Sequence, residues 1–282
     1  MNSKLELSDV DFNYFRDLIF NLAGIHLSVA KKDLIVSRLR NHIKELGLSD
    51  LEDYKKYLQA QKPKSPEFQK FINLLTTNKT DFFREPEHFE FLVKTFLPEW
   101  LKHGRKVLNI WSCASSTGEE IYTLAMVLNL HLPKHCTFKI LATDIDSEVL
   151  KTAANGVYPI SKLHEIPADY QKSSVALGTA EISQRFKIKN VIKEKVIFKQ
   201  HNLMDQYENT NEVFDIIFCR NVLIYFTKET IEQVVHKLLL KTTVGGYLLI
   251  GHSESLSGIK TNWKNLQPSI YKRVDDKTQI PL

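Results

Sequence analysis

Five short apolar runs in the second half of the chain constrain the fold more than any other feature of the sequence. They lie at 107–111, 138–142, 196–198, 214–218 and 247–250, and helical patterns separate most of them. Short apolar strands that alternate with helices are typical of a parallel sheet buried on both faces. The pattern predicts an α/β domain with a mostly parallel sheet over residues 76–282. Residues 269–274 are expected to add a closing edge strand.

The first 75 residues follow a helical pattern instead. Apolar residues such as Phe12, Phe15 and Ile19 recur at helical spacing, and a second such stretch runs from about 31 to 46. Ser49 and Glu52 form a capping box that is expected to begin a third helix. We therefore predict a small all-helical domain over residues 1–75.

The stretch from Val157 to Glu194 is too long for an ordinary crossover between two strands. Its pieces 186–189 and 191–192 are apolar and short. They predict a small β hairpin inserted in the α/β domain at about 157–194.

The loop after the first predicted strand marks a ligand site. In a doubly wound sheet, ligands bind beyond the carboxyl ends of the strands, where the strand order reverses. The loop 111–120 contains a single glycine, so it matches neither the dinucleotide fingerprint nor the phosphate loop. Glu119 and Glu120 would repel a phosphate but would suit a ligand with hydroxyls, an amine and a positive charge. The alternative is that both only stabilise the N-terminus of the next helix.

Polar residues also follow the next three strands. Asp144 ends the second strand, where a carboxylate can accept hydrogen bonds from both ribose hydroxyls, while Asp146 fits a helix cap better. Asn202 and Leu203 follow the third strand, where an amide can read an adenine edge and a leucine can cover its face. The alternative for Asn202 is an ordinary turn residue. Arg220 and Asn221 end the fourth strand, and Tyr225 follows; alone, Tyr225 is more often a packed aromatic.

The run Thr76-Thr77-Asn78-Lys79-Thr80-Asp81-Phe82-Phe83-Arg84-Glu85 mixes hydroxyls, an amide, aromatics and an arginine, which suits neither a core nor a linker. Further motifs follow in order: Ser-Thr-Gly-Glu-Glu, Thr-Asp-Ile-Asp, Asn-Leu, Phe-Cys-Arg-Asn-Val-x-Ile-Tyr-Phe and Gly-His-Ser-Glu. Together they resemble the CheR-type chemotaxis receptor glutamate methyltransferases over nearly the whole chain. One departure is Ile121, where the family usually has proline after Glu-Glu; the change is expected to matter little.

The resemblance implies a Rossmann-like methyltransferase that uses S-adenosylmethionine to methyl-esterify glutamates of chemoreceptors, with S-adenosylhomocysteine as product and no metal. Carried over by motif, the cofactor-binding residues are Asn78, Thr80, Arg84, Glu120, Asp144, Asn202, Leu203, Asn221 and Val222. Arg84 and Tyr225 are implied beside the reacting groups, in a pocket that we expect Phe82 and Phe83 to wall as well. Arg38 and Arg40 are implied in receptor docking by the helical domain. The β insert resembles the subdomain by which some members grip a receptor tail.

Composition limits the alternatives. A 43% apolar and 25% charged composition is that of a globular protein. The sequence has no membrane-spanning run, no signal peptide and no cysteine or histidine metal spacing, so a cytoplasmic protein without membrane insertion is expected. The net charge of +5 allows a nucleic-acid methyltransferase. That alternative lacks the Asp/Asn-Pro-Pro-Tyr motif after the fourth strand, so no nucleic-acid partner is expected. A catalytically silent module that binds the cofactor or docks receptors is the other alternative.

Overall fold

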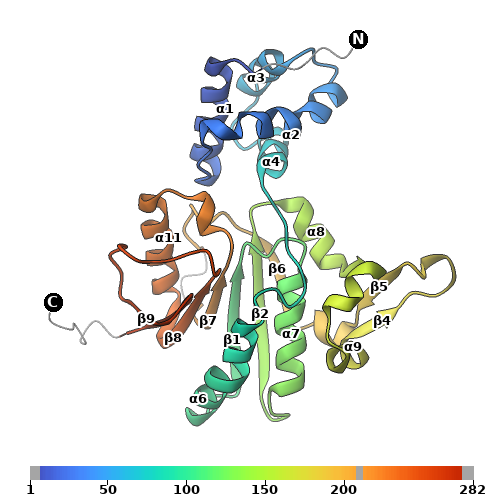
Figure 1. The fold of residues 1–282 in the computed structure, drawn as a ribbon, viewed down its shortest axis with the longest axis vertical. Coiled ribbons are helices and arrows are strands. Elements are labelled where there is room, and N and C mark those ends of the chain that lie inside the picture. Colours follow the sequence, from blue (N-terminus) through green and yellow to red (C-terminus); the bar gives the residue numbers. More distant parts are fainter. Residues whose placement is uncertain (1–6, 208–211, 275–282) are drawn as a thin grey trace.

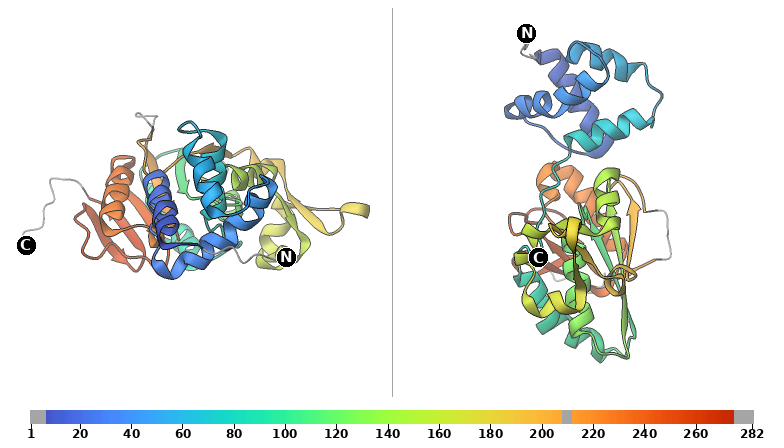
Figure 2. Two further views of the ribbon diagram at one scale, coloured as in Figure 1. Left: turned by 90° about the horizontal axis from the view of Figure 1, so that it is seen from above. Right: turned by 90° about the vertical axis from the view of Figure 1, so that its right-hand side faces the viewer.

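The computed structural model describes residues 7–207 and 212–274. Four helices form a unit at one end of the long axis, which we call the helical unit (Figure 1). They are α1 (Asp9–Ala23), α2 (Lys32–Glu45), α3 (Leu51–Gln59) and α4 (Pro66–Leu75), with a 3₁₀ turn η1 (Val29–Lys31) before α2. Figure 2 shows from two further sides that this unit stands on the sheet-containing part of the molecule.

The helical unit has its own apolar core. The rings of Phe15, Tyr54 and Phe71 are all fully buried, and Phe15 lies within 6.1 Å of both of the others. The expected capping box at the start of α3 is wrong: the cap is Asp50, whose side chain accepts the Asp53 N–H at 2.9 Å. Aspartate is at least as good a cap as serine, and it stands directly before the first helical residue.

One irregular stretch, Thr76–Glu85, connects the helical unit to the rest of the chain; we call it the crossing segment. After it, α5 (Glu87–Phe91), the π-helical turn η2 (Leu92–Phe96) and α6 (Leu97–Lys102) form one continuous helical rod. That rod carries Phe89, Leu92 and Trp100 into the core beneath the sheet.

A seven-stranded sheet forms the centre of the second part. Its order is β6-β2-β1-β7-β8-β10-β9, and the first five of these strands are parallel. The parallel strands are β1 (Val107–Cys113), β2 (Thr137–Asp144), β6 (Val196–Gln200), β7 (Phe214–Cys219) and β8 (Thr242–Ile250). The chain builds outward from β1 to β6 and then returns to the other side of β1, so the strand order reverses between β1 and β7. Ligands of doubly wound sheets bind at this reversal.

The expected closing edge strand is only partly right. Residues Ile270–Arg273 do form a strand, β10, but it lies between β8 and a further strand, β9 (Trp263–Gln267). Strand β10 runs antiparallel to both neighbours. Strand β9 has only one buried residue, Trp263. It therefore lacks the apolar run by which the other strands are predicted.

Helices cover both faces of the sheet. Helix α7 (Glu119–His131) and the α5–α6 rod share one apolar core with β1 and β2. Helix α11 (Lys228–Leu240) covers the opposite face, where Val234 and Leu238 pack in a second core with Trp111. Helix α8 (Ser147–Asn155) follows β2 and contacts β6, and the 3₁₀ turn η5 (Leu223–Tyr225) precedes α11.

The insert lies beside α7 and contains a second, antiparallel sheet of order β3-β5-β4 (Figure 1). Its elements are β3 (Val157–Pro159), η3 (Ile160–Glu165), α9 (Ala168–Ser174), β4 (Val175–Leu177), η4 (Ala180–Ile182), β5 (Arg185–Ile188) and α10 (Asn190–Lys193). The expected small β insert is confirmed, and most of its piece 186–189 lies in β5, but the second piece, 191–192, lies in the one-turn helix α10 and does not pair as a strand. Within this second piece Ile192 is buried and Val191 is exposed. A single helical turn is enough to bury Ile192.

Within residues 7–207 and 212–274, no helix is long and apolar enough to span a lipid bilayer.

Candidate functional site

A cavity of about 480 Å³ lies where the helical unit meets the carboxyl ends of the parallel strands. The loops after β1, β2, β6 and β7 form one wall, and the crossing segment passes along it. The end of α1 and the start of α2, from Ala23 to Leu34, form the opposite wall. The cavity therefore stands at the reversal of strand order that the fold defines.

The structure brings the predicted cofactor and catalytic residues together around this cavity. All ten border it: Asn78, Thr80, Arg84, Glu120, Asp144, Asn202, Leu203, Asn221, Val222 and Tyr225. They come from the crossing segment, from the start of α7, from the last residue of β2 and from the segments that follow β6 and β7. The two predicted docking residues, Arg38 and Arg40, are exposed on α2 and do not border it.

Asp144 is a buried carboxylate at the end of β2. Its oxygens accept the backbone N–H groups of Ser116 at 2.8 Å and Asp146 at 2.9 Å. Burial raises its pKa to about 6, although these hydrogen bonds oppose the shift. Asp146 caps α8 by accepting the N–H groups of Glu148 and Val149, as its position predicts. Asp144 thus keeps acceptor capacity for a ligand, since a carboxylate has about four lone-pair positions.

Arg220 connects two glutamates at the cavity. Its guanidinium lies 2.9 Å from Glu120 Oε2 and 2.9 Å from Glu85 Oε2. Burial opposes ionisation of Glu85, but the Arg220 charge and its hydrogen bonds outweigh it and hold the Glu85 pKa at about 2. Glu120 also accepts the Ser112 hydroxyl at 2.8 Å. The formal side-chain charges of these three residues sum to −1, so this group carries one acidic charge that Arg220 does not balance.

Neither Arg220 nor Glu85 is among the site residues predicted from sequence. Both belong to motifs noted there, Arg220 directly before Asn221 and Glu85 at the end of the crossing segment. The pattern of apolar and polar residues reports only local structure. It therefore cannot reveal the pairing of Arg220 with Glu85, which are 135 positions apart.

Hydrogen bonds to several elements hold the crossing segment in place. Asn78 Nδ2 donates to Asp146 Oδ2 at 2.7 Å, and Lys162 of the insert donates to the Thr80 carbonyl at 3.0 Å. The Phe82 N–H donates to Glu165 Oε2 at 2.8 Å. Arg84 donates to the Lys79 carbonyl at 3.1 Å, within the segment itself. Arg84 also borders the cavity, and its guanidinium forms no ion pair with any residue that the structure describes.

Two aromatic residues expected to wall the cavity do not border it. The Phe82 ring lies 5.0 Å from that of Tyr158, and the Phe83 ring lies 5.0 Å from that of Tyr170, both in the insert. Phe82 is 3% exposed, and burying its ring in the core removes more apolar surface from water than a place in the cavity wall would. Phe89 and Phe226 border the cavity instead, with Tyr225.

The helical unit contributes a wall that sequence reasoning missed. The Tyr225 carbonyl accepts the His26 N–H at 2.7 Å, and Asn202 Nδ2 donates to the Leu22 carbonyl at 2.7 Å. The Asn202 amide therefore ties the helical unit to the end of β6, in addition to bordering the cavity. Arg38 donates to the Thr76 carbonyl at 3.1 Å. Backbone carbonyls accept all three of these bonds, and side-chain pairs such as Asn73 Nδ2 to Ser147 Oγ at 3.1 Å add to the contact.

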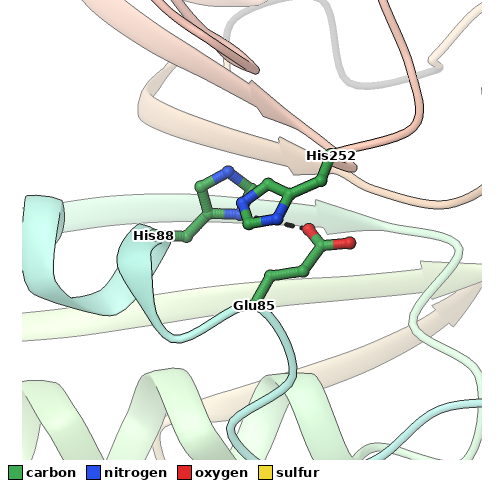
Figure 3. A group of neighbouring side chains, drawn as sticks. All are labelled: Glu85, His88 and His252. Atoms are coloured by element: carbon green, nitrogen blue, oxygen red, sulfur yellow. Dashed lines mark ion pairs between the residues drawn. The ribbon is translucent and has the colours of Figure 1, made fainter.

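Glu85 also belongs to a compact group with His88 and His252 (Figure 3). Their ligand atoms lie within 4.8 Å of one another, and Glu85 Oε2 is 3.6 Å from His88 Nδ1. Burial and the Arg220 charge lower the His88 pKa to about 3, so its ring is neutral. A metal ion here would stand beside the Arg220 guanidinium, which repels it. We therefore assign Glu85 to the Arg220 network.

A crevice at the strand-order reversal, with a buried acidic residue ending β2, defines a nucleoside-binding Rossmann-like domain. Residues 78–272 match the family model described as "CheR methyltransferase, SAM binding domain", and residues 10–76 match "CheR methyltransferase, all-alpha domain". The fold is therefore that of an S-adenosylmethionine-dependent methyltransferase with a helical N-terminal domain. The chain belongs to the CheR methyltransferase family.

Curated relatives match over nearly the full chain. A "Chemotaxis protein methyltransferase" of Salmonella typhimurium is 36% identical over 98% of this chain and 94% of its own length. One of Borreliella burgdorferi is 36% identical over 97% of this chain and 100% of its own. One of Escherichia coli is 34% identical over 96% of this chain and 93% of its own.

Proposed function

We propose that this protein transfers a methyl group from S-adenosylmethionine to glutamate side chains of chemoreceptors, which yields glutamate methyl esters and S-adenosylhomocysteine. One observation carries the proposal: the ten residues that the family motifs assign to cofactor and catalysis, from distant parts of the chain, all border one cavity. Membership of the CheR family and the names of the relatives support the receptor as substrate.

The residues present fit this cofactor. Asp144 would hold the ribose hydroxyls, and Asn202 and Leu203 would hold the adenine. Glu120, which is ion-paired with Arg220, would face the cationic methionine end of the cofactor, together with Asn221 and Val222. Asn78, Thr80 and Arg84 would complete the site from the crossing segment. A cavity of about 480 Å³ is large enough for a nucleoside of this size.

The proposed chemistry requires orientation rather than proton transfer. The bound cofactor supplies an electrophilic sulfonium methyl group. A substrate glutamate is already anionic at pH 7, because its unperturbed pKa is about 4.3. Arg84 cannot serve as a base, since a guanidinium stays protonated. We assign to Arg84 and Tyr225 the role of orienting the carboxylate at the cavity, where positioning and exclusion of water favour the reaction.

We further propose residues 1–75 as a receptor-docking domain and 76–282 as the methyltransferase domain. Exposed cations of α2, Arg38 and Arg40, would meet the acidic side chains of a receptor helix. Both lie on the helix that begins at the cavity wall. A receptor docked along α2 would therefore present its glutamates near the cavity.

The insert, about 157–194, is proposed to bind a receptor C-terminal tail. A second hollow at its junction with α8 is lined by three cations, Arg185, Lys187 and Lys193. Leu177 on the edge strand β4 is 62% exposed. An extended peptide that ends in a carboxylate offers both an apolar contact and an anion, and a strand edge can pair with it.

A methyl-transfer assay tests the proposal. The protein is incubated with methyl-labelled S-adenosylmethionine and cytoplasmic receptor fragments, with the same fragments carrying glutamate-to-glutamine substitutions as the control. Base-labile label on the glutamate-containing fragments alone is the expected result. Label on added RNA or DNA, or cofactor binding without any labelled receptor, would overturn it and favour the nucleic-acid enzyme or the silent module.

A further inference from the structure

Asn221 adopts a left-handed backbone conformation, which few residue types other than glycine and asparagine tolerate. It lies two residues after the end of β7 and has a φ of 57°. This region is uncommon for residues other than glycine; asparagine tolerates it, and neighbouring groups that bond to the backbone hold it there. Asn221 also borders the cavity, so whatever holds it determines what the cofactor meets there.

A buried carboxylate holds the Asn221 backbone. Glu254 is 8% exposed and accepts four main-chain N–H groups. These belong to Gly251 at 2.5 Å, Asn221 at 2.9 Å, Leu223 at 2.7 Å and Ile224 at 3.3 Å. Two of the donors, Leu223 and Ile224, are consecutive, as in backbone nests that bind anions, and hydrogen bonds to a charged acceptor are stronger than neutral ones.

Space around the amide of Asn221 is tightly limited. A Cβ atom added at Gly251 would lie 2.4 Å from Asn221 Nδ2 and 2.9 Å from Glu254 Oε2. The Gly251–Glu254 turn therefore packs against both the side chain and the carboxylate that fixes the backbone. The position accepts glycine because of this close approach.

A second carboxylate fixes which end of the Asn221 amide faces the cavity. Asn221 Nδ2 donates to Glu85 Oε1 at 3.2 Å, while Glu85 Oε2 is ion-paired to Arg220. An ionised carboxylate can only accept hydrogen bonds, so the amide must turn its NH₂ group toward Glu85. Among the described residues, no hydrogen bond uses Asn221 Oδ1. That oxygen remains available to a ligand.

We propose that Glu85 and Glu254 are positioning residues that clamp Asn221, so that its side-chain carbonyl oxygen rather than its NH₂ group faces the cofactor. The recognised ligand group is then a hydrogen-bond donor, such as an amino group. The inference rests on the cofactor site proposed above. It adds that Asn221 accepts a hydrogen bond from the cofactor instead of donating one.

A double-mutant cycle tests the polarity, with the dissociation constant of S-adenosylhomocysteine measured by calorimetry. Asn221→Asp places two carboxylates face to face and is expected to weaken binding about 100-fold. Adding Glu85→Gln supplies an NH₂ group that can donate to the new aspartate, and is expected to recover about 10-fold. A double variant that binds no better than Asn221→Asp would overturn the assignment to Glu85.

A second cycle tests Glu254. Glu254→Gln is expected to raise the KM for the cofactor about 10-fold with little change in kcat, because one of its oxygens becomes a donor facing N–H groups. In an Asn221→Ala background the same substitution should change binding less than about 3-fold. An equal effect in both backgrounds would show a general structural role and overturn the proposal.

Controls separate this inference from the proposed function. Glu99→Gln, a glutamate paired with Lys272 and outside the cavity border, should leave binding unchanged. Thermal unfolding of each variant identifies those that fail to fold. If the unsubstituted protein binds S-adenosylhomocysteine and the cycles hold while receptors stay unlabelled, the proposed function fails and the clamp stands. If it binds but the cycles fail, the clamp alone is wrong.

Discussion

The two walls of the cavity differ in how they are held. On the sheet side, Asp144, Glu120 and Asn221 are each fixed by hydrogen bonds or ion pairs to neighbouring strands and loops. On the helical side, the border includes the apolar residues Ala23, Ile25, Leu27 and Leu34. Short backbone contacts, such as His26 N–H to the Tyr225 carbonyl, join the two sides.

This difference assigns the walls separate tasks. Groups that must face charge at a defined position belong on a rigid scaffold, because misplacement by about 1 Å is costly in catalysis. The helical wall, which mixes its apolar residues with His26, Ser28 and Lys31, needs shape and water exclusion instead. Substitutions on the sheet side should therefore change chemistry and cofactor binding directly. Those on the helical side should change receptor recognition, and cofactor binding only through the fit between the two walls.

The largest effect is expected at the crossing segment. Arg84→Ala should lower kcat/KM for receptor methylation about 100-fold or more, because it removes the positioned cation at the cavity. Tyr225→Phe should cost far less, since only a hydroxyl is lost. Steady-state kinetics with labelled cofactor measures both, and near-normal turnover of the Arg84 variant would contradict the assignment.

The next largest effect concerns Asp144. Asp144→Asn should weaken S-adenosylhomocysteine binding about 10- to 100-fold, since hydrogen bonds to a charged group contribute about 1.5–3 kcal/mol. Because burial raises the Asp144 pKa to about 6, binding to the unsubstituted protein should be strong above that pH and should weaken as the pH falls through it. Calorimetry between pH 5 and 8 measures the profile, which should be absent in the Asn variant. An unchanged profile there would assign the titration to another group.

A matched pair of glycines tests the helical side. Gly24 and Gly47 both have a φ of 71°, but a Cβ at Gly24 would lie 2.5 Å from Met204 Sδ, whereas Gly47 has no atom within 4 Å. Each alanine variant should cost about 1 kcal/mol for the left-handed backbone. Gly24→Ala should cost more in thermal unfolding and should also weaken cofactor binding. Equal losses at both positions would show that the contact between the two walls contributes nothing.

The smallest effect is expected on the outer face of α2. Arg40→Ala should raise the KM for receptor a few-fold, with more effect at low salt, because exposed charge pairs contribute under about 1 kcal/mol each. Binding of S-adenosylhomocysteine should stay unchanged, as Arg40 does not border the cavity. A change in cofactor affinity without a change in receptor KM would contradict the docking role.

The sequence predicts the sheet-side wall well because strand periodicity and loop position determine it. Apolar runs locate β1, β2, β6, β7 and β8, and their carboxyl ends then place Asp144, Asn202 and Asn221 near one another. The same reasoning missed β9, which buries a single residue, and misread Val191–Ile192, which is too short to distinguish a strand from a helical turn.

The helical-side wall and the charge network could not be predicted in this way. Contacts such as Asn202 to the Leu22 carbonyl depend on where a backbone oxygen lies, and every residue has one. For Phe82 and Phe83 the residue type is informative but ambiguous. Their residue type fits both a cavity wall and a core, and only packing against Tyr158 and Tyr170 decides between them.

The crossing segment has a thermodynamic consequence for the whole molecule. It is the single covalent connection between two units that border one cavity, so under the proposed function a nucleoside bound there would contact both and act as a reversible cross-link. Occupancy would then stabilise the assembled arrangement by mass action, and release of the product would weaken the joint between the units.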